Sequence, residues 1–154
     1  KPEIRESYDV FDIGKNLPTE IDNFQKSVSD LINHGMSLNL KILRCLETSL
    51  GLEKDTLISR HQNQFTDNNK SLLRILHYPP IPKDVTEGAI RCGEHSDYGT
   101  HTLLFQDSMG GLEVKNRKGK WIKANPIEGA ILVNVGDLLE MWTNGKFIAT
   151  VSLH

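Results

Sequence analysis

Apolar residues follow two different patterns along this chain, one before and one after residue 70. In residues 21–50 they recur every three or four positions, which is the spacing of one face of an α-helix. Pro18 and Thr19 precede this stretch and can start a helix. Gly51 follows it and can end one, and Gly35 is a point where the helix can bend or divide. A short second helix is predicted over residues 54–61, followed by a polar loop.

After residue 70 the apolar residues gather in short runs that are separated by turn signals. Strands are predicted at 72–78, 101–106, 112–115, 120–124, 130–135 and 146–151, and one turn of helix at 136–143. Several short strands at such spacing are typical of a sandwich or barrel. We therefore expect a mostly β fold with N-terminal helices, in which a helical segment (1–70) packs on a β core (71–154).

Composition and charge narrow the classes of function. The chain has 154 residues, with 18 basic and 20 acidic side chains and a formal net charge of −2. No basic face is predicted, so nucleic acid is not an expected partner. Neither a membrane-spanning run nor a secretory signal is expected, because the apolar runs are short and residues 1–12 are polar. Two cysteines, Cys45 and Cys92, are too few for a disulfide framework, which favours a cytoplasmic location.

His95 and Asp97 carry the clearest chemical signal. They stand two residues apart in "CGEHSDYGTHTLLFQD", and in an extended strand such residues point to the same face. Both can then reach one ion, and a second histidine from a later strand would complete a 2-His-1-carboxylate site for Fe(II). Zinc can use the same residues, although structural zinc sites usually have four protein ligands. The alternative without a metal is a salt-bridged pair in a surface loop.

The wider sequence context favours iron. The pair stands after "LRILHYPP" and before "GGLEV", "GKWIKANP" and "GAILVNVGDLLEMWTNG". In this order and spacing, residues 72–151 resemble the isopenicillin N synthase-like group of Fe(II)/2-oxoglutarate-dependent dioxygenases. The resemblance implies a double-stranded β-helix (jelly roll) preceded by helices.

The resemblance also implies site residues and cofactors. His95 and Asp97 match the first two iron ligands. Tyr78 matches a tyrosine that lines the 2-oxoglutarate pocket, and Arg74 matches an arginine at the start of that strand. The implied cofactors are Fe(II), 2-oxoglutarate as co-substrate and ascorbate as a candidate reductant. The implied reaction oxidises a C–H bond of a small organic substrate with O₂ and releases succinate and CO₂. Neither the substrate nor the oligomeric state can be deduced from the sequence.

The third iron ligand is where the sequence departs from the family. In the family's register the second histidine falls at Ser152, and His154 follows two residues later. Two residues along a strand move a side chain by about 6.6 Å, so His154 becomes the third metal ligand only if the strand bulges or shifts. The family's next strand, which supplies an arginine and a serine to the co-substrate, has no counterpart before residue 154. We therefore expect a truncated member of the family with a jelly roll that is incomplete at the C-terminus.

Two other functions stay open. A truncated jelly roll with an incomplete site would act, if at all, by protein association through exposed sheet edges. A metal-dependent hydrolase would need a general base beside the metal, and Glu94 is the nearest carboxylate outside the pair.

Overall fold

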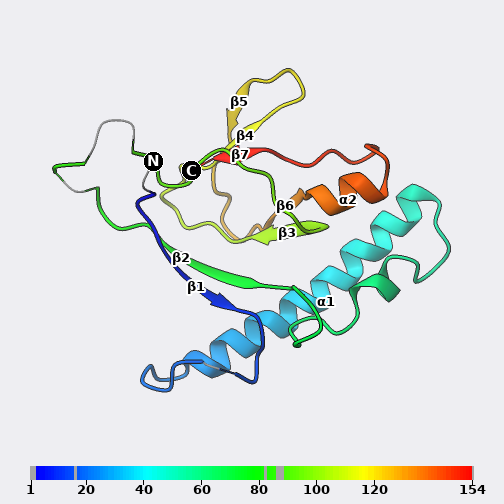
Figure 1. Cartoon of the computed structure of the whole chain (residues 1–154), viewed down its shortest axis with the longest axis horizontal. Coiled ribbons are helices and arrows are strands. Elements are labelled where there is room, and N and C mark those ends of the chain that lie inside the picture. Colours follow the sequence, from blue (N-terminus) through cyan, green and yellow to red (C-terminus); the bar gives the residue numbers. More distant parts are fainter. Residues whose placement is uncertain (1–2, 16, 82, 86–88, 154) are drawn as a thin grey trace. The chain divides into compact units, whose positions relative to one another are not determined.

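A computed structural model of the chain describes residues 3–15, 17–81, 83–85 and 89–153 (Figure 1). The chain divides into two compact units. Ser7–Leu76 form the first, which we call the helix unit, and Lys1–Glu6 with His77–His154 form the second, which we call the strand unit. Over the residues that the structure describes, no helix is both long enough and apolar enough to cross a membrane.

The long helix predicted from the apolar spacing is confirmed as α1 (Phe24–Leu50). It runs through Gly35 as one helix and ends at Gly51, whose φ of 67° is the left-handed conformation that glycine adopts without strain. The amide of Gly51 donates to the carbonyls of the last turn. The buried positions of α1 lie on one face: Val28, Ile32, Asn39, Leu43 and Glu47.

The helix unit has its core where α1 meets the first strand. Strand β1 (Glu6–Val10), which the sequence did not predict, pairs with β2 (Leu73–His77), which it did. Val10 of β1 packs with Val28 and Ile32 of α1 in one buried cluster. The second helix expected over 54–61 is shorter than predicted, a 3₁₀ helix η1 (Ile58–His61).

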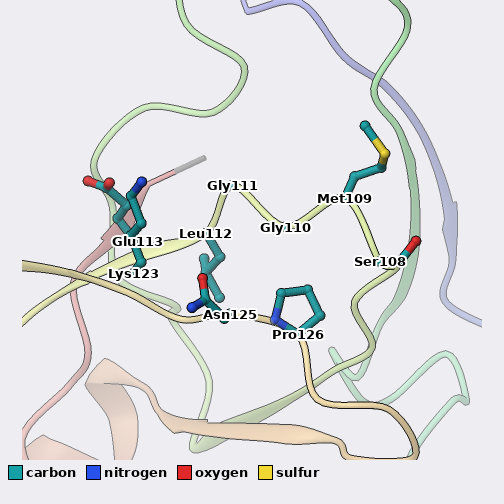
Figure 2. Close-up of a pocket in the computed structure, with 9 residues that line it drawn as sticks. All are labelled: Ser108, Met109, Gly110, Gly111, Leu112, Glu113, Lys123, Asn125 and Pro126. Carbon is teal, nitrogen blue, oxygen red and sulfur yellow. The ribbon is translucent and has the colours of Figure 1, made fainter.

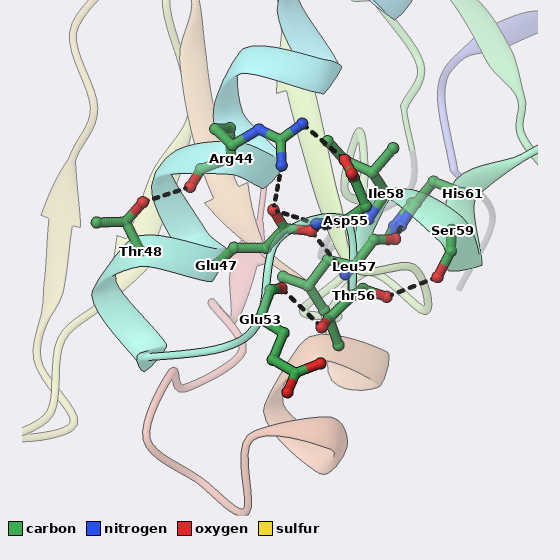
Figure 3. A network of polar contacts seen from close by, with 10 residues as sticks. All are labelled: Arg44, Glu47, Thr48, Glu53, Asp55, Thr56, Leu57, Ile58, Ser59 and His61. Atoms are coloured by element: carbon green, nitrogen blue, oxygen red, sulfur yellow. Dashed lines mark hydrogen bonds and ion pairs between the residues drawn. The ribbon is translucent and has the colours of Figure 1, made fainter.

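A buried carboxylate joins α1 to the segment before η1. Glu47 is 2% exposed and accepts the backbone amides of Asp55, Leu57 and Ile58 at 3.2, 2.8 and 3.2 Å. Arg44 donates to the same carboxylate at 3.0 Å and to Asp55 at 2.7 Å. Figure 3 shows these contacts converging on Glu47. Leu57 of this segment is itself buried, and Glu47 adds polar contacts that hold the segment against α1.

The strand unit consists of small antiparallel sheets. Strand β3 (His101–Leu104) pairs with β6 (Leu132–Val135), and a second sheet has the order β5 (Trp121–Lys123), β4 (Glu113–Lys115), β7 (Ser152–Leu153). The short helix α2 (Asp137–Trp142) follows β6, as expected for residues 136–143. The strands predicted at 101–106, 112–115, 120–124 and 130–135 are therefore confirmed, each over a shorter length.

The strand predicted at 146–151 is wrong, because β7 begins only at Ser152. The reason is that the backbone amides of this segment bond to groups other than those of a neighbouring strand in a regular β ladder. The Ala149 amide donates to the side chain of Glu140 in α2, and the Thr150 amide donates to the carbonyl of Val135 at 3.1 Å. Pairing with β4 starts only at Val151, whose carbonyl accepts the backbone amide of Lys115 at 2.8 Å.

Candidate metal-binding site

His95 and Asp97 face each other in the loop before β3. His95 Nε2 lies 3.7 Å from Asp97 Oδ1, and the side chains are 44% and 32% exposed. The two side chains thus approach each other, although the prediction assumed an extended strand at this place. The loop itself is irregular, and its pairing is a single antiparallel bridge between His95 and Ser152.

The carboxylate of Asp97 is held by two neutral donors. Thr102 Oγ1 donates to Oδ2 at 2.6 Å, and Asn134 Nδ2 donates to the same oxygen at 2.8 Å. Thr102 and Asn134 are direct partners across β3 and β6, so the sheet register brings both donors to one place. Oδ1 is left to face His95. Hydrogen bonds of this kind orient a metal-binding carboxylate without neutralising its charge.

The hydrogen bond of His95 fixes its tautomer. Nδ1 lies 2.8 Å from the carbonyl of Gly93. A carbonyl only accepts, so Nδ1 must carry the proton, and in the neutral ring Nε2 then has a free lone pair. Nε2 is the nitrogen that faces Asp97. Cys92 Sγ lies 3.7 Å from Nδ1 and accepts from Arg5 at 3.2 Å, so this thiol packs behind the imidazole.

The loop that carries Asp97 is anchored to the start of α2. The amides of Gly136, Asp137 and Leu138 donate to the carbonyls of Thr100, Asp97 and Gly99 at 3.0, 2.7 and 3.1 Å. A Cβ on Gly136 would lie 2.3 Å from the Gly99 oxygen and 2.7 Å from the Asp97 oxygen. The backbones approach so closely that only glycine fits at this position. The Gly136–Asp137 turn therefore holds the loop that carries Asp97 in place.

The donor set fits two positions of a metal ion. Two ligand atoms 3.7 Å apart can each lie about 2.0–2.2 Å from a shared ion. Within the part of the chain that the structure describes, no group of three histidine, cysteine, aspartate or glutamate side chains could hold a metal. His154, the predicted third ligand, lies outside the described residues.

Tyr78 and Arg74, the predicted co-substrate residues, have different surroundings. Burial, above all, raises the pKa of Tyr78, and Arg5 acts in the opposite direction. Its phenol therefore keeps its proton at neutral pH, and the guanidinium of Arg91 lies 5.7 Å from its ring centre. Arg74 donates to Asp9 through Nε at 2.8 Å and Nη2 at 2.7 Å, a two-point contact between β2 and β1.

Two further features belong to the strand unit. Glu94, the base considered for a hydrolase, forms an ion pair with Lys115 at 2.7 Å. A pocket of about 380 Å³ lies by the β4–β5 sheet, and Figure 2 shows Glu113 and Lys123 on neighbouring strands at one end and Ser108 and Met109 at the other. Its lining residues are 108–113, 123, 125 and 126, so it contains neither His95 nor Asp97.

The sequence did not identify three residues that shape the site. Thr102 lies in β3 beside two leucines, and Asn134 lies between two valines of β6. A polar residue within a predicted strand is the signal that could have pointed to them. Gly136 was predicted at the start of the short helix over 136–143, but its close approach to the Asp97 loop depends on a contact that sequence alone does not show.

Comparison with known proteins identifies the family. The sequence profile of the 2OG-Fe(II) oxygenase superfamily matches residues 69–151. The 2-oxoglutarate-dependent dioxygenase gloF of Glarea lozoyensis is 38% identical over 94% of this chain and 46% of its own length. The 2-oxoglutarate-dependent dioxygenase htyE of Aspergillus rugulosus is 40% identical over 82% of this chain and 36% of its own length.

A solved structure is similar to this chain over nearly its whole length. A full-length Neurospora crassa protein, crystallised in complex with alpha-KG, matches with a TM-score of 0.84 and 36% identity, over 99% of this chain and 48% of that chain. The chain belongs to the 2OG-Fe(II) oxygenase superfamily. It spans about half the length of relatives such as gloF and the Neurospora crassa protein.

Proposed function

We propose that this chain contributes the iron-binding part of an Fe(II)- and 2-oxoglutarate-dependent oxygenase. The whole protein would oxidise a C–H bond of a small organic substrate with O₂ and release succinate and CO₂. The observation that carries the proposal is the facing pair of His95 Nε2 and Asp97 Oδ1 at 3.7 Å, in a chain of this superfamily. The small antiparallel sheets of the strand unit would be part of a double-stranded β-helix.

Each site residue has a proposed role. Fe(II), when bound, supplies the redox chemistry that couples O₂ to the co-substrate and to the C–H bond. His95 would bind the ion through Nε2 and Asp97 through Oδ1, with Oδ2 held by its two neutral donors. The protonated phenol of Tyr78 would donate to a carboxylate of 2-oxoglutarate. Arg74, the other predicted co-substrate residue, lies in the helix unit, and its role in binding the co-substrate stays a prediction.

Anaerobic iron binding tests the proposal on the 154-residue chain. Bound Fe(II) should fall in Asp97→Ala and His95→Ala, and it should be unchanged in Asp107→Ala, a matched control whose carboxylate caps its own turn by accepting the Met109 amide. Iron binding that is the same in the wild type and all these variants would refute the proposed site. Succinate formation, measured with 2-oxoglutarate and O₂ on the same samples, reports whether these residues suffice for turnover.

Protein association is the second candidate function. Large apolar side chains are exposed on the strand unit, with Tyr98 at 91%, Met109 at 87% and Ile127 at 74%. Such residues favour contact with another surface. Sedimentation velocity should then show self-association that Met109→Ser weakens and Asp97→Ala leaves unchanged, whereas a monomer at all concentrations argues against self-association.

A cytoplasmic location stays a prediction.

A further inference from the structure

Ser152 stands directly opposite His95. The His95 amide donates to the Ser152 carbonyl at 3.0 Å, and the Ser152 amide donates to the His95 carbonyl at 2.9 Å. This exchange of both bonds marks a directly opposed antiparallel pair. The side chains of such a pair project from the same face, with Cβ atoms about 4.5–5.5 Å apart. Ser152 is therefore the position on β7 that shares a face with His95.

The register of Ser152 is fixed from its other side as well. Val114 of β4 is its partner there, and Glu113 is the partner of Leu153. The Lys115 amide adds a bond to the Val151 carbonyl at 2.8 Å. His95, Ser152 and Val114 thus form one row across three segments. Successive residues of a strand alternate between faces, so Leu153 projects away from this row.

We infer that Ser152 occupies the place of the third metal ligand, so that the described part of this chain offers two metal-binding side chains, His95 and Asp97, beside Ser152. Ser152→His then completes a set of three. The inference rests on the proposed function, because it assumes that an ion binds between His95 and Asp97. A neutral hydroxyl is a weak ligand for a divalent first-row metal, whereas imidazole is a strong one. The wild-type site therefore binds such ions weakly, through His95 Nε2 and Asp97 Oδ1.

Titration with Co(II) tests the inference without requiring turnover. Co(II) is a suitable probe because it accepts the same ligands and its visible absorption reports their number and geometry. Ser152→His should bind Co(II) about tenfold more tightly or better, since even partners that only orient a ligand change affinity by 10–100-fold. Ser152→Ala should bind like the wild type, and so should His154→Ala. The double variant Ser152→His/Asp97→Ala should lose the gain.

The outcomes separate this inference from the proposed function. If Asp97→Ala leaves Co(II) affinity unchanged, no ion binds at the pair and the proposed function fails. If Asp97→Ala weakens binding but Ser152→His gives no gain, the proposed function stands and the inference about Ser152 is wrong. Loss of wild-type binding in His154→Ala, or in Ser152→Ala, overturns the inference as well.

A second variant covers the case in which Ser152→His does not fold. Ser152→Cys is nearly isosteric, so it disturbs packing little. A cysteine beside the bound ion gives a Co(II)–thiolate charge-transfer band in the near ultraviolet, whereas a distant one gives none. The wild type, which has Cys92 and Cys45, supplies the background. A Ser152→Cys spectrum equal to that background, in folded protein that binds Co(II), overturns the inference.

Discussion

Thr102 and Asn134 are opposed across β3 and β6, and both donate to the same oxygen of Asp97. The carboxylate is thus oriented by the register of a two-stranded sheet rather than by its own loop. Removing one donor should let the carboxylate rotate. We expect Asn134→Ala to lower Co(II) affinity about tenfold, in the wild type or in Ser152→His. Asn116→Ala, which removes an amide from the turn before β5, is the control, and equal losses in the two variants would contradict this role.

The close approach of Gly136 to the Asp97 loop predicts an effect on stability. In Gly136→Ala the new Cβ would meet the Gly99 and Asp97 oxygens at 2.3 and 2.7 Å, so the α2 start or the loop must move. We expect a loss of about 1–3 kcal/mol, as for other overpacked positions, and therefore a lower melting temperature. Gly99→Ala is the matched control, because nothing lies within 4 Å of a Cβ there. A Gly136→Ala protein as stable as Gly99→Ala would contradict the close contact.

Sequence reasoning worked where one residue's neighbours along the chain determine its environment. The period of α1 and its end at Gly51 both follow from local geometry. The two donors to Asp97 come from β3 and β6, which are far apart along the chain. No local pattern connects them, so the sequence did not identify them.

The wrong or missing predictions also depend on contacts that the local sequence does not show. Residues 146–151 have the composition of a strand, but Glu140 takes the Ala149 amide and prevents a regular ladder. Strand β1 is short and mostly polar, and it forms because Val10 reaches the face of α1. Ser152 was identified from the register of the family, and the pairing with His95 is a long-range contact that gives the same position a physical reason.

Arg74 allows a test that separates stability from co-substrate binding. Its pair with Asp9 joins side chains that are 44% and 26% exposed, and such surface pairs contribute about 0–1 kcal/mol. Arg74→Ala and Asp9→Ala should therefore lower the melting temperature equally and only slightly. If Arg74 also binds 2-oxoglutarate, equilibrium dialysis with iron-loaded protein should show weaker retention in Arg74→Ala alone. Equal retention in both variants would remove Arg74 from the proposed site.

Glu47 predicts how the stability of the helix unit depends on pH. Burial by itself opposes ionisation of Glu47, but the amides of Ile58, Leu57 and Asp55, with Arg44, outweigh it and hold its pKa below the ordinary value of 4.5. A carboxyl with a lowered folded-state pKa stabilises the fold fully above its unfolded-state pKa. As the pH falls below about 4.5, the unfolded state takes up the proton first, so this stability declines until the pH passes the folded-state pKa.

The corresponding experiment compares Glu47→Gln with the wild type from about pH 7 to about pH 3, a range that spans the ordinary carboxyl pKa. Glu47→Gln should lower the melting temperature by several degrees at neutral pH, because a neutral amide cannot replace the ionic acceptor of three backbone amides. The difference between the two proteins should then shrink below about pH 4.5, where the wild type loses the same contribution. Glu53→Gln is the control, since the exposed side chain of Glu53 points away from the network in Figure 3. A difference that stays constant over the whole acid range would show that the charge of Glu47 does not stabilise the segment before η1.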